Sequence, residues 1–248
     1  MAESRSYGKR KNTGEVGTPQ GGSISVLLSN VYLHYVLDLW FEKVVKPRLK
    51  GEAYLIRYID DFIICFQYRS DANRFHETLK KRLEKFALTL EPNKTRLVEF
   101  GRFATKHAKE RGKRLESIYF LGFTHYCTTN RKGNFMVGRK TEKTRLKRSI
   151  IKLQATLREI RHSPIKEQVA VINSVLRGHY NYYGVAGNLK SLFKIYLRTE
   201  HYWKRMLSSR CSKGYVTWEK FQAIKGTFPI LRPKLSIPYM SLKAYAML

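Results

Sequence analysis

The sequence predicts an α+β fold, in which a mixed N-terminal part precedes a mostly helical C-terminal part. Two observations carry this prediction. Runs of β-prone residues occur only in the first half, whereas the second half has the three- and four-residue apolar spacing of helices. Residues 1–100 carry 17 basic and 12 acidic residues, but residues 101–248 carry 31 and 7. Such a shift in composition indicates two parts with different roles.

The first part begins with a loop followed by a helix. Gly17-Thr18-Pro19-Gln20-Gly21-Gly22 has three glycines and a proline in six residues, which predicts a turn-rich loop. Apolar residues then repeat every three or four positions over residues 27–40, as in an amphipathic helix. Pro47 and Gly51 are expected to end that helix.

A hairpin with an acidic tip is predicted next. The β-prone runs 53–58 and 62–67 flank Ile59-Asp60-Asp61, which favours two antiparallel strands joined at that tripeptide. Helical spacing returns over residues 71–86, and short strands are expected around residues 95–100 and 118–126. A basic loop flanked by glycines is expected over residues 102–114.

The second part is predicted to be a helical bundle. Apolar seams at helical spacing run over residues 146–160, 165–180 and 189–203. The tail from Gly226 contains Pro229, Pro233 and Pro238, so we expect it to be extended. We place the domain boundary between residues 138 and 139.

Composition narrows the classes of function. The 248 residues carry 48 Lys and Arg against 19 Asp and Glu, a formal net charge of +29, which indicates a polyanionic partner and nucleic acid first. A hydrophobic content of 43% excludes a disordered basic tail. No run of ~18 uninterrupted apolar residues exists, so no membrane partner is expected. The three cysteines are widely separated, which favours reduced thiols and a cytoplasmic, nucleic-acid-associated location.

Asp60-Asp61 is the sharpest candidate for chemistry. Adjacent carboxylates repel one another at a hairpin tip unless a cation lies between them, and hard Mg²⁺ prefers carboxylate oxygen. Two such ions stabilise the attacking and leaving oxygens of phosphoryl transfer. The alternative is an ordinary solvated turn, because Asp is a common turn residue.

The surrounding motifs resemble the reverse transcriptase palm, and most closely the group II intron reverse transcriptase/maturase family. Tyr58-Ile59-Asp60-Asp61 lies between two strands, after the Gly17 to Gly22 loop and the stretch that begins Ser23-Ile24-Ser25. Three further motifs follow in the order of that family: Leu90-Glu91-Pro92-Asn93-Lys94-Thr95, Phe120-Leu121-Gly122-Phe123, and Arg177-Gly178-His179-Tyr180-Asn181-Tyr182-Tyr183-Gly184.

This resemblance implies a partial right-hand polymerase palm over residues 1–138 and a thumb/maturase bundle over 139–248. It implies RNA-directed DNA polymerase activity, with Mg²⁺ bound by Asp60 and Asp61, and Lys94 close to the incoming triphosphate. The remaining implied roles are template and nucleotide binding by Gln20, Gly21, Gly22 and Tyr58, and a primer grip at Leu121, Gly122 and Phe123, where a plain buried strand is the alternative.

The implied partners are a DNA primer, deoxynucleoside triphosphates, and RNA as both template and intron. A basic surface is expected on the first thumb helix, where charges face outward and phosphate contacts would be independent of sequence. Its residues are Arg139, Lys140, Lys143, Lys147 and Arg148. The aromatic residues Tyr180, Tyr182, Tyr183, Tyr202 and Trp203 either stack on bases or fill the bundle, and the core role is favoured.

The sequence also departs from the family pattern. Reverse transcriptases use a third metal-binding Asp before the glycine-rich loop, and none of the 16 residues before Gly17 is Asp. We therefore expect an N-terminally truncated chain with impaired catalysis, for which a complementary N-terminal fragment is one partner. Val26 and Ile59 replace the more usual Pro and Ala, and no paired-cysteine zinc endonuclease module follows the thumb. The alternatives are a non-catalytic RNA-binding maturase and an inactive remnant.

Overall fold

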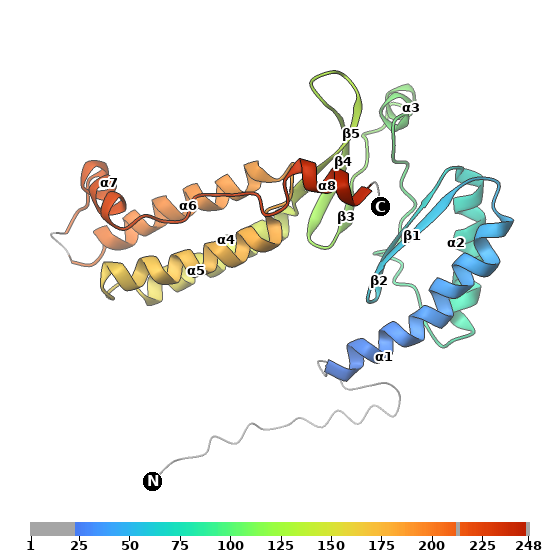
Figure 1. The fold of residues 1–248 in the computed structure, drawn as a ribbon, viewed down its shortest axis with the longest axis horizontal. Coiled ribbons are helices and arrows are strands. Elements are labelled where there is room, and N and C mark those ends of the chain that lie inside the picture. The colour runs from blue at the N-terminus through green and yellow to red at the C-terminus, as the bar shows by residue number, and fades with distance from the viewer. Residues whose placement is uncertain (1–22, 212–213, 247–248) are drawn as a thin grey trace, which may run out of the picture. The chain divides into compact units, whose positions relative to one another are not determined.

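The computed structural model describes residues 23–211 and 214–246, and the backbone contacts divide the chain into two compact units (Figure 1). The first unit comprises residues 1–97 and the second residues 98–248. Small antiparallel sheets are followed by several helices, so the α+β class is confirmed.

A long helix opens the described part of the N-terminal unit. It starts as α1 (Ser23–Leu33) and continues through two π-helical turns, η1 (His34–Asp38) and η2 (Phe41–Val45), into the short 3₁₀ segment η3 (Lys46–Arg48). Leu49 then leaves helical geometry, with φ −83° and ψ 151°. The predicted helix is confirmed, and its end near Pro47 agrees with the sequence. The π-helical turns were not expected, because periodicity does not distinguish them from α-helix.

The predicted hairpin and second helix are also confirmed. Strands β1 (Ala53–Tyr58) and β2 (Asp61–Phe66) pair antiparallel, with Ala53 opposite Phe66 and Tyr58 opposite Asp61. Helix α2 (Arg69–Glu84) follows. One face of the hairpin packs on the long helix and on α2 through a shared apolar core. The buried residues of that core are Val36, Leu37, Phe41, Ala53, Phe75, Leu79 and Leu83.

A three-stranded antiparallel sheet lies in the C-terminal unit, in the order β3-β4-β5. Its strands are Ile118–Phe120, Phe123–Thr129 and Phe135–Thr141, and helix α3 (Ala104–Glu110) precedes them. This arrangement corrects two expectations and adds one strand that was not predicted. Residues 95–100 form no strand, residues 104–110 form a helix inside the expected basic loop, and residues 135–141 form a strand that alternation alone did not reveal.

Three long helices then form the predicted bundle. They are α4 (Lys143–Glu159), α5 (Ile165–Tyr183) and α6 (Leu189–Ser208). Their apolar seams meet in one core, in which Leu153, Leu176, Leu192 and Trp203 are at most 1% exposed. The tail is only partly extended. Helix α7 (Trp218–Thr227) precedes an extended run, and α8 (Tyr239–Ala246) follows Pro238, which suits a helix start.

Within the described residues, one helix is long and apolar enough to span a membrane by length and composition. It is Ile24–Arg48, with a mean hydropathy of 1.3 and 22% of its most apolar window buried. The same helix carries Val36, Leu37 and Phe41 of the core, and core helices meet this criterion too. The absence of a membrane partner therefore stays a prediction.

Candidate active site and nucleic-acid interface

The acidic tip of the β1–β2 hairpin is the candidate metal site. Ile59 and Asp60 form a two-residue turn, and Asp61 begins β2 directly opposite Tyr58. Both carboxylates are exposed, and Tyr58 is 58% exposed on the face that points away from the core. Strand alternation explains this placement. Ala53, Leu55 and Arg57 point inward, whereas the residues between them and Tyr58 point outward.

The turn has an unusual backbone. Ile59 adopts φ +58°, although it is β-branched and such residues rarely enter the left-handed region. A positive φ at the first of two turn residues, but not at the second, is the mark of a type II′ hairpin, which favours glycine at the first position. The turn that carries Asp60 is therefore held in place by the structure around it rather than by local preference.

A guanidinium group supplies that support. Arg57 donates from Nε and Nη2 to the two carboxylate oxygens of Asp38, at 2.8 and 2.6 Å. Its Nη1 donates to Asn30 Oδ1 at 2.9 Å and to the Ile59 carbonyl oxygen at 2.7 Å. The hydrogen bonds to Asp38 raise the pKa of Arg57 against the opposing effect of burial. Sequence reasoning missed this network, although an arginine on the inward face of an apolar strand was the available signal.

The hairpin tip suits a hard cation in its donor set, because Asp60 and Asp61 both offer carboxylate oxygens. Among the described residues, no group of three or more His, Cys, Asp or Glu side chains is arranged to hold a metal ion. Mg²⁺ in nucleotide enzymes is usually held by one or two carboxylates, with waters and substrate phosphates completing the shell. Asp60 and Asp61 therefore fit Mg²⁺ that is bound together with a substrate.

Of the other residues predicted for this site, the structure places Tyr58 at the tip and Lys94 in a separate turn. Lys94 is exposed in a turn in which its N–H donates to the Glu91 carbonyl at 3.1 Å. No hydrogen bond or ion pair in the described part of the chain joins the Lys94 ammonium group to Asp60 or Asp61. Gln20, Gly21 and Gly22 lie outside the described residues.

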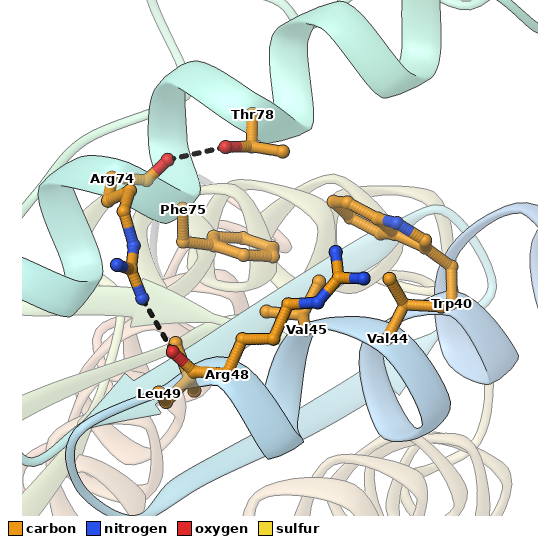
Figure 2. A pocket seen from close by; sticks show the side chains of 8 residues that line it. All are labelled: Trp40, Val44, Val45, Arg48, Leu49, Arg74, Phe75 and Thr78. Carbon is orange, nitrogen blue, oxygen red and sulfur yellow. Dashed lines mark hydrogen bonds between the residues drawn. The ribbon is translucent and has the colours of Figure 1, made fainter.

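A separate pocket of about 270 Å³ lies in the same unit, between the end of the long helix and α2 (Figure 2). Its wall is mostly apolar, and Arg74 crosses it to donate to the Arg48 carbonyl at 2.6 Å. None of the predicted site residues lines it. The lining residues are Trp40, Val44, Val45, Arg48, Leu49, Arg74, Phe75 and Thr78.

In the C-terminal unit, the predicted grip motif forms a tight turn against helix α5. Leu121 and Gly122 both have positive φ, +48° and +76°, as a type I′ turn requires. The Tyr182 hydroxyl donates to the Leu121 carbonyl at 3.2 Å, and the Phe123 and Tyr182 rings stack with centroids 6.3 Å apart. A Cβ on Gly122 would lie 3.1 Å from the Tyr183 hydroxyl. Two motifs that are far apart in the sequence are thus in contact.

Two histidines flank this turn with unpartnered ring nitrogens. His179 on α5 is 9% exposed, its Nε2 has no hydrogen-bond partner, and burial lowers its pKa to about 4. His125 on β4 has an unpartnered buried Nδ1, and its pKa is lowered by burial and then by the charge of Arg139. Both rings are therefore neutral near pH 7, and they contribute polarity rather than charge.

The predicted basic residues lie on two elements rather than one, which corrects the expectation of a single helix. Arg139 and Lys140 are on β5, and helix α4 begins only at Lys143. Lys140 lies over the Tyr126 ring, with its Nζ 5.2 Å from the ring centroid. Within the described residues, none of the five forms an ion pair. Four are exposed and Arg139 is half-buried.

The aromatic residues divide as burial predicts. Tyr180, Tyr202 and Trp203 are at most 9% exposed and fill the bundle core, so the core role is confirmed for them. Tyr183 is half-buried, whereas Tyr182 is 57% exposed and remains open to a ligand on one side.

A comparison with known protein families covers the segment that contains the acidic hairpin. Residues 4–125 match the family model described as reverse transcriptase (RNA-dependent DNA polymerase). The matched segment includes Tyr58 to Asp61, Lys94, and the Leu121 to Phe123 turn. No curated protein matches the chain. Residues 4–125 are therefore a reverse transcriptase family domain.

Proposed function

We propose that the chain is an RNA-directed DNA polymerase of the group II intron type, which acts in the cytoplasm and also binds intron RNA. The observation that carries the proposal is the exposed pair of carboxylates at the tip of a hairpin inside a reverse transcriptase family domain. The +24 formal charge of residues 101–248 supports a nucleic-acid partner. In this proposal residues 1–138 act as the palm and residues 139–248 as the thumb.

The palm residues would hold and orient the reactants. Mg²⁺ bound at Asp60 and Asp61 would stabilise charge on the attacking and leaving oxygens. Tyr58 presents its ring on the same face as Asp61 and would support the base pair at the reaction centre. Gln20, Gly21 and Gly22 would line the template and nucleotide side, where glycine lets the backbone approach closely. Lys94 would neutralise or protonate the leaving pyrophosphate.

Residues of the C-terminal unit would hold the primer and the RNA. The turn formed by Leu121, Gly122 and Phe123 would contact the primer terminus. The Tyr182 hydroxyl, which donates to the Leu121 carbonyl, would fix the position of this turn. Lys143, Lys147 and Arg148 are exposed on α4, and Arg139 and Lys140 precede them on β5. Their contacts would be to phosphates, which position RNA without reading its bases.

Primer extension on an RNA template tests the polymerase proposal. The full chain is assayed with a DNA primer, all four deoxynucleoside triphosphates and Mg²⁺. Impaired catalysis is expected of this chain, so the parent rate should be slow. We expect Asp60→Asn to lower that rate further, by at least about 100-fold, because charge stabilisation by a metal ion is worth several kcal/mol. The control is Glu77→Gln, an exposed carboxylate on α2. No extension by the parent chain, or extension that survives Asp60→Asn, would contradict the proposal.

An RNA-binding maturase without polymerase activity is the second candidate, and the charge of the C-terminal unit favours it. In this case Asp60→Ala leaves both RNA affinity and splicing support unchanged, whereas charge reversal at Lys143 and Lys147 abolishes RNA binding. Gel-shift titration and a splicing assay with the same variants distinguish the two candidates. Loss of splicing support in Asp60→Ala would rule out the maturase without catalysis.

A further inference from the structure

The backbone at the acidic turn needs an external support. Ile59 stands at the position of a two-residue turn that favours glycine, and its φ of +58° is unfavourable for a β-branched side chain. Conformations of this kind persist only where surrounding contacts over-determine them. Asp60 is the next residue, so any relaxation of Ile59 moves its carboxylate.

Arg57 provides the support through a fixed fork of hydrogen bonds. Its side chain is only 12% exposed, and it donates to three residues on two segments of the chain, the long helix and the acidic turn. Asp38 lies in the π-helical turn η1 and accepts two of the bonds, and Asn30 on α1 accepts a third. The fourth, at 2.7 Å, goes to the carbonyl oxygen of Ile59 itself.

The hydrogen bonds of Arg57 connect the turn to the long helix. Asp38 and Asn30 lie on the long helix, which is packed into the core of the N-terminal unit. Arg57 therefore ties the carbonyl of the strained residue to a helix that is packed into the core. A planar guanidinium can satisfy these separated acceptors at the same time, whereas an ammonium group offers its donors from a single point.

We propose that Arg57 is the positioning residue of the acidic turn, and that it holds Ile59 in its left-handed conformation so that Asp60 and Asp61 face outward together. The importance of this for nucleotide addition rests on the proposed function, but the conformational claim does not. An ion pair that serves only the stability of the unit would depend on Asp38 alone and would not need the bond to Ile59.

Amide hydrogen exchange of the full chain tests the conformational claim. The reporters are the amides of Tyr58 and Asp61, the pair that closes the turn, and those of Ile56 and Ile63, the next hydrogen-bonded pair of the hairpin, serve as internal references. We expect Arg57→Gln to speed exchange at Tyr58 and Asp61 about tenfold relative to the references, the effect of losing one charge-assisted hydrogen bond. Arg69→Gln, an exposed arginine on α2, should change nothing.

Two further variants separate positioning from stability. Arg57→Lys keeps the charge next to Asp38, so we expect near-normal thermal unfolding but fast exchange at the turn. Leu79→Ala destabilises the core of the same unit and should leave the ratio between turn and reference amides unchanged. If Arg57→Lys restored slow exchange at the turn, or Leu79→Ala raised the ratio as much as Arg57→Gln, the proposal would be wrong.

A double-mutant cycle with Ile59→Gly tests the strain itself. Glycine adopts this conformation without penalty, so the turn should then depend less on Arg57, and the tenfold effect of Arg57→Gln should shrink to about twofold. Equal effects of Arg57→Gln in the parent chain and in the Ile59→Gly variant would show that the two residues act independently and would overturn the proposal.

Kinetics connect the turn to nucleotide addition. In primer extension we expect Arg57→Gln to lower kcat with little change in the KM for deoxynucleoside triphosphate, because the displaced carboxylates affect the chemical step more than nucleotide binding. If the parent chain shows no Asp60-dependent extension, the proposed function fails while the exchange measurements still decide the role of Arg57.

Discussion

Some buried polar side chains join separate segments of the chain through hydrogen bonds. The Asp71 carboxylate accepts from the backbone N–H groups of Lys50 and Gly51, at 2.9 and 3.2 Å. The Asn188 side chain is fully buried and joins Thr141 at the end of β5 to the Tyr183 carbonyl at the end of α5. By contrast, Nε2 of His179 and Nδ1 of His125 are buried without a hydrogen-bond partner.

His179 makes stability depend on pH. Its pKa is about 4 in the folded chain and about 6.5 in the unfolded chain, so below pH 6.5 the unfolded state binds a proton that the folded state does not. We expect the free energy of unfolding to fall by roughly 2–3 kcal/mol as the pH drops from 6.5 to 4, and His179→Phe to remove most of that fall. Urea denaturation at several pH values measures it.

His162→Phe is the control for this prediction, because His162 is exposed. That variant should keep the full pH dependence of the parent chain. His125 also has a lowered pKa and should leave a smaller slope in His179→Phe. An unchanged slope in His179→Phe would show that the ring is accessible to protons in the folded protein.

At the scale of the elements, the sheet of the C-terminal unit is joined to its helices by a few tight contacts. The β3–β4 turn packs on the end of α5 through Tyr182 and Tyr183, and the Glu142 N–H before α4 donates to the Gly122 carbonyl at 2.9 Å. Because this turn contacts the helices that carry the basic residues, the predicted grip and the predicted RNA surface belong to one packed body.

Gly122→Ala should disturb this junction. The residue has φ +76°, and the new methyl group would lie 3.1 Å from the Tyr183 hydroxyl, so we expect a loss of about 2 kcal/mol in the free energy of unfolding. Gly133→Ala is the matched control. Gly133 has φ +79°, and nothing lies within 4 Å of the added methyl group. The Gly133→Ala variant therefore has the cost of the unfavourable backbone conformation without a steric contact.

The difference between the two variants measures how tightly the turn packs on α5. Thermal denaturation followed by circular dichroism should show a clearly larger loss for Gly122→Ala than for Gly133→Ala. Equal losses would mean that Tyr183 moves away from the turn at no cost.

The whole molecule separates its charge along the chain. All four aspartates lie between residues 38 and 71, whereas residues 101–248 contain 31 basic residues and only 7 glutamates. Acidic partners are therefore scarce where the basic side chains of α4 are exposed. Neutralisation of that surface needs an external polyanion.

RNA affinity should accordingly depend strongly on salt. We expect Lys143→Gln/Lys147→Gln to make the slope of log K against log salt concentration shallower by about 1.4, since each phosphate contact on a single strand contributes about 0.7. The control pair is Lys81→Gln/Lys85→Gln, two exposed lysines four residues apart in the N-terminal unit. Fluorescence anisotropy at several salt concentrations measures both slopes. If the salt-dependence slope changed equally in the two double variants, the RNA contacts would not be specific to Lys143 and Lys147.

Local patterns in the sequence predicted most of the elements, because their causes are local. Apolar spacing located α2, α4, α5 and α6, and the runs on either side of Ile59-Asp60-Asp61 located the hairpin. Strand β5 was not predicted, because it contains the charged residues Arg139 and Lys140 and few β-branched residues. Helix α3 was missed as well, because its seven residues are mostly polar.

The sequence by itself determined the acidic tip, the basic C-terminal half and the order of the motifs, because each of these depends on residue type and spacing. Only the tertiary structure showed which hydrogen bonds fix the acidic turn and the Leu121 turn in place. Arg57 meets Asp38, Asn30 and the Ile59 carbonyl, and Tyr182 meets Leu121, across separations of 2 to 61 residues. Such contacts depend on how elements pack, since a hydrogen-bond donor in a sequence does not specify its acceptor. The conformation of the acidic turn is therefore a property of the fold rather than of the four residues that form it.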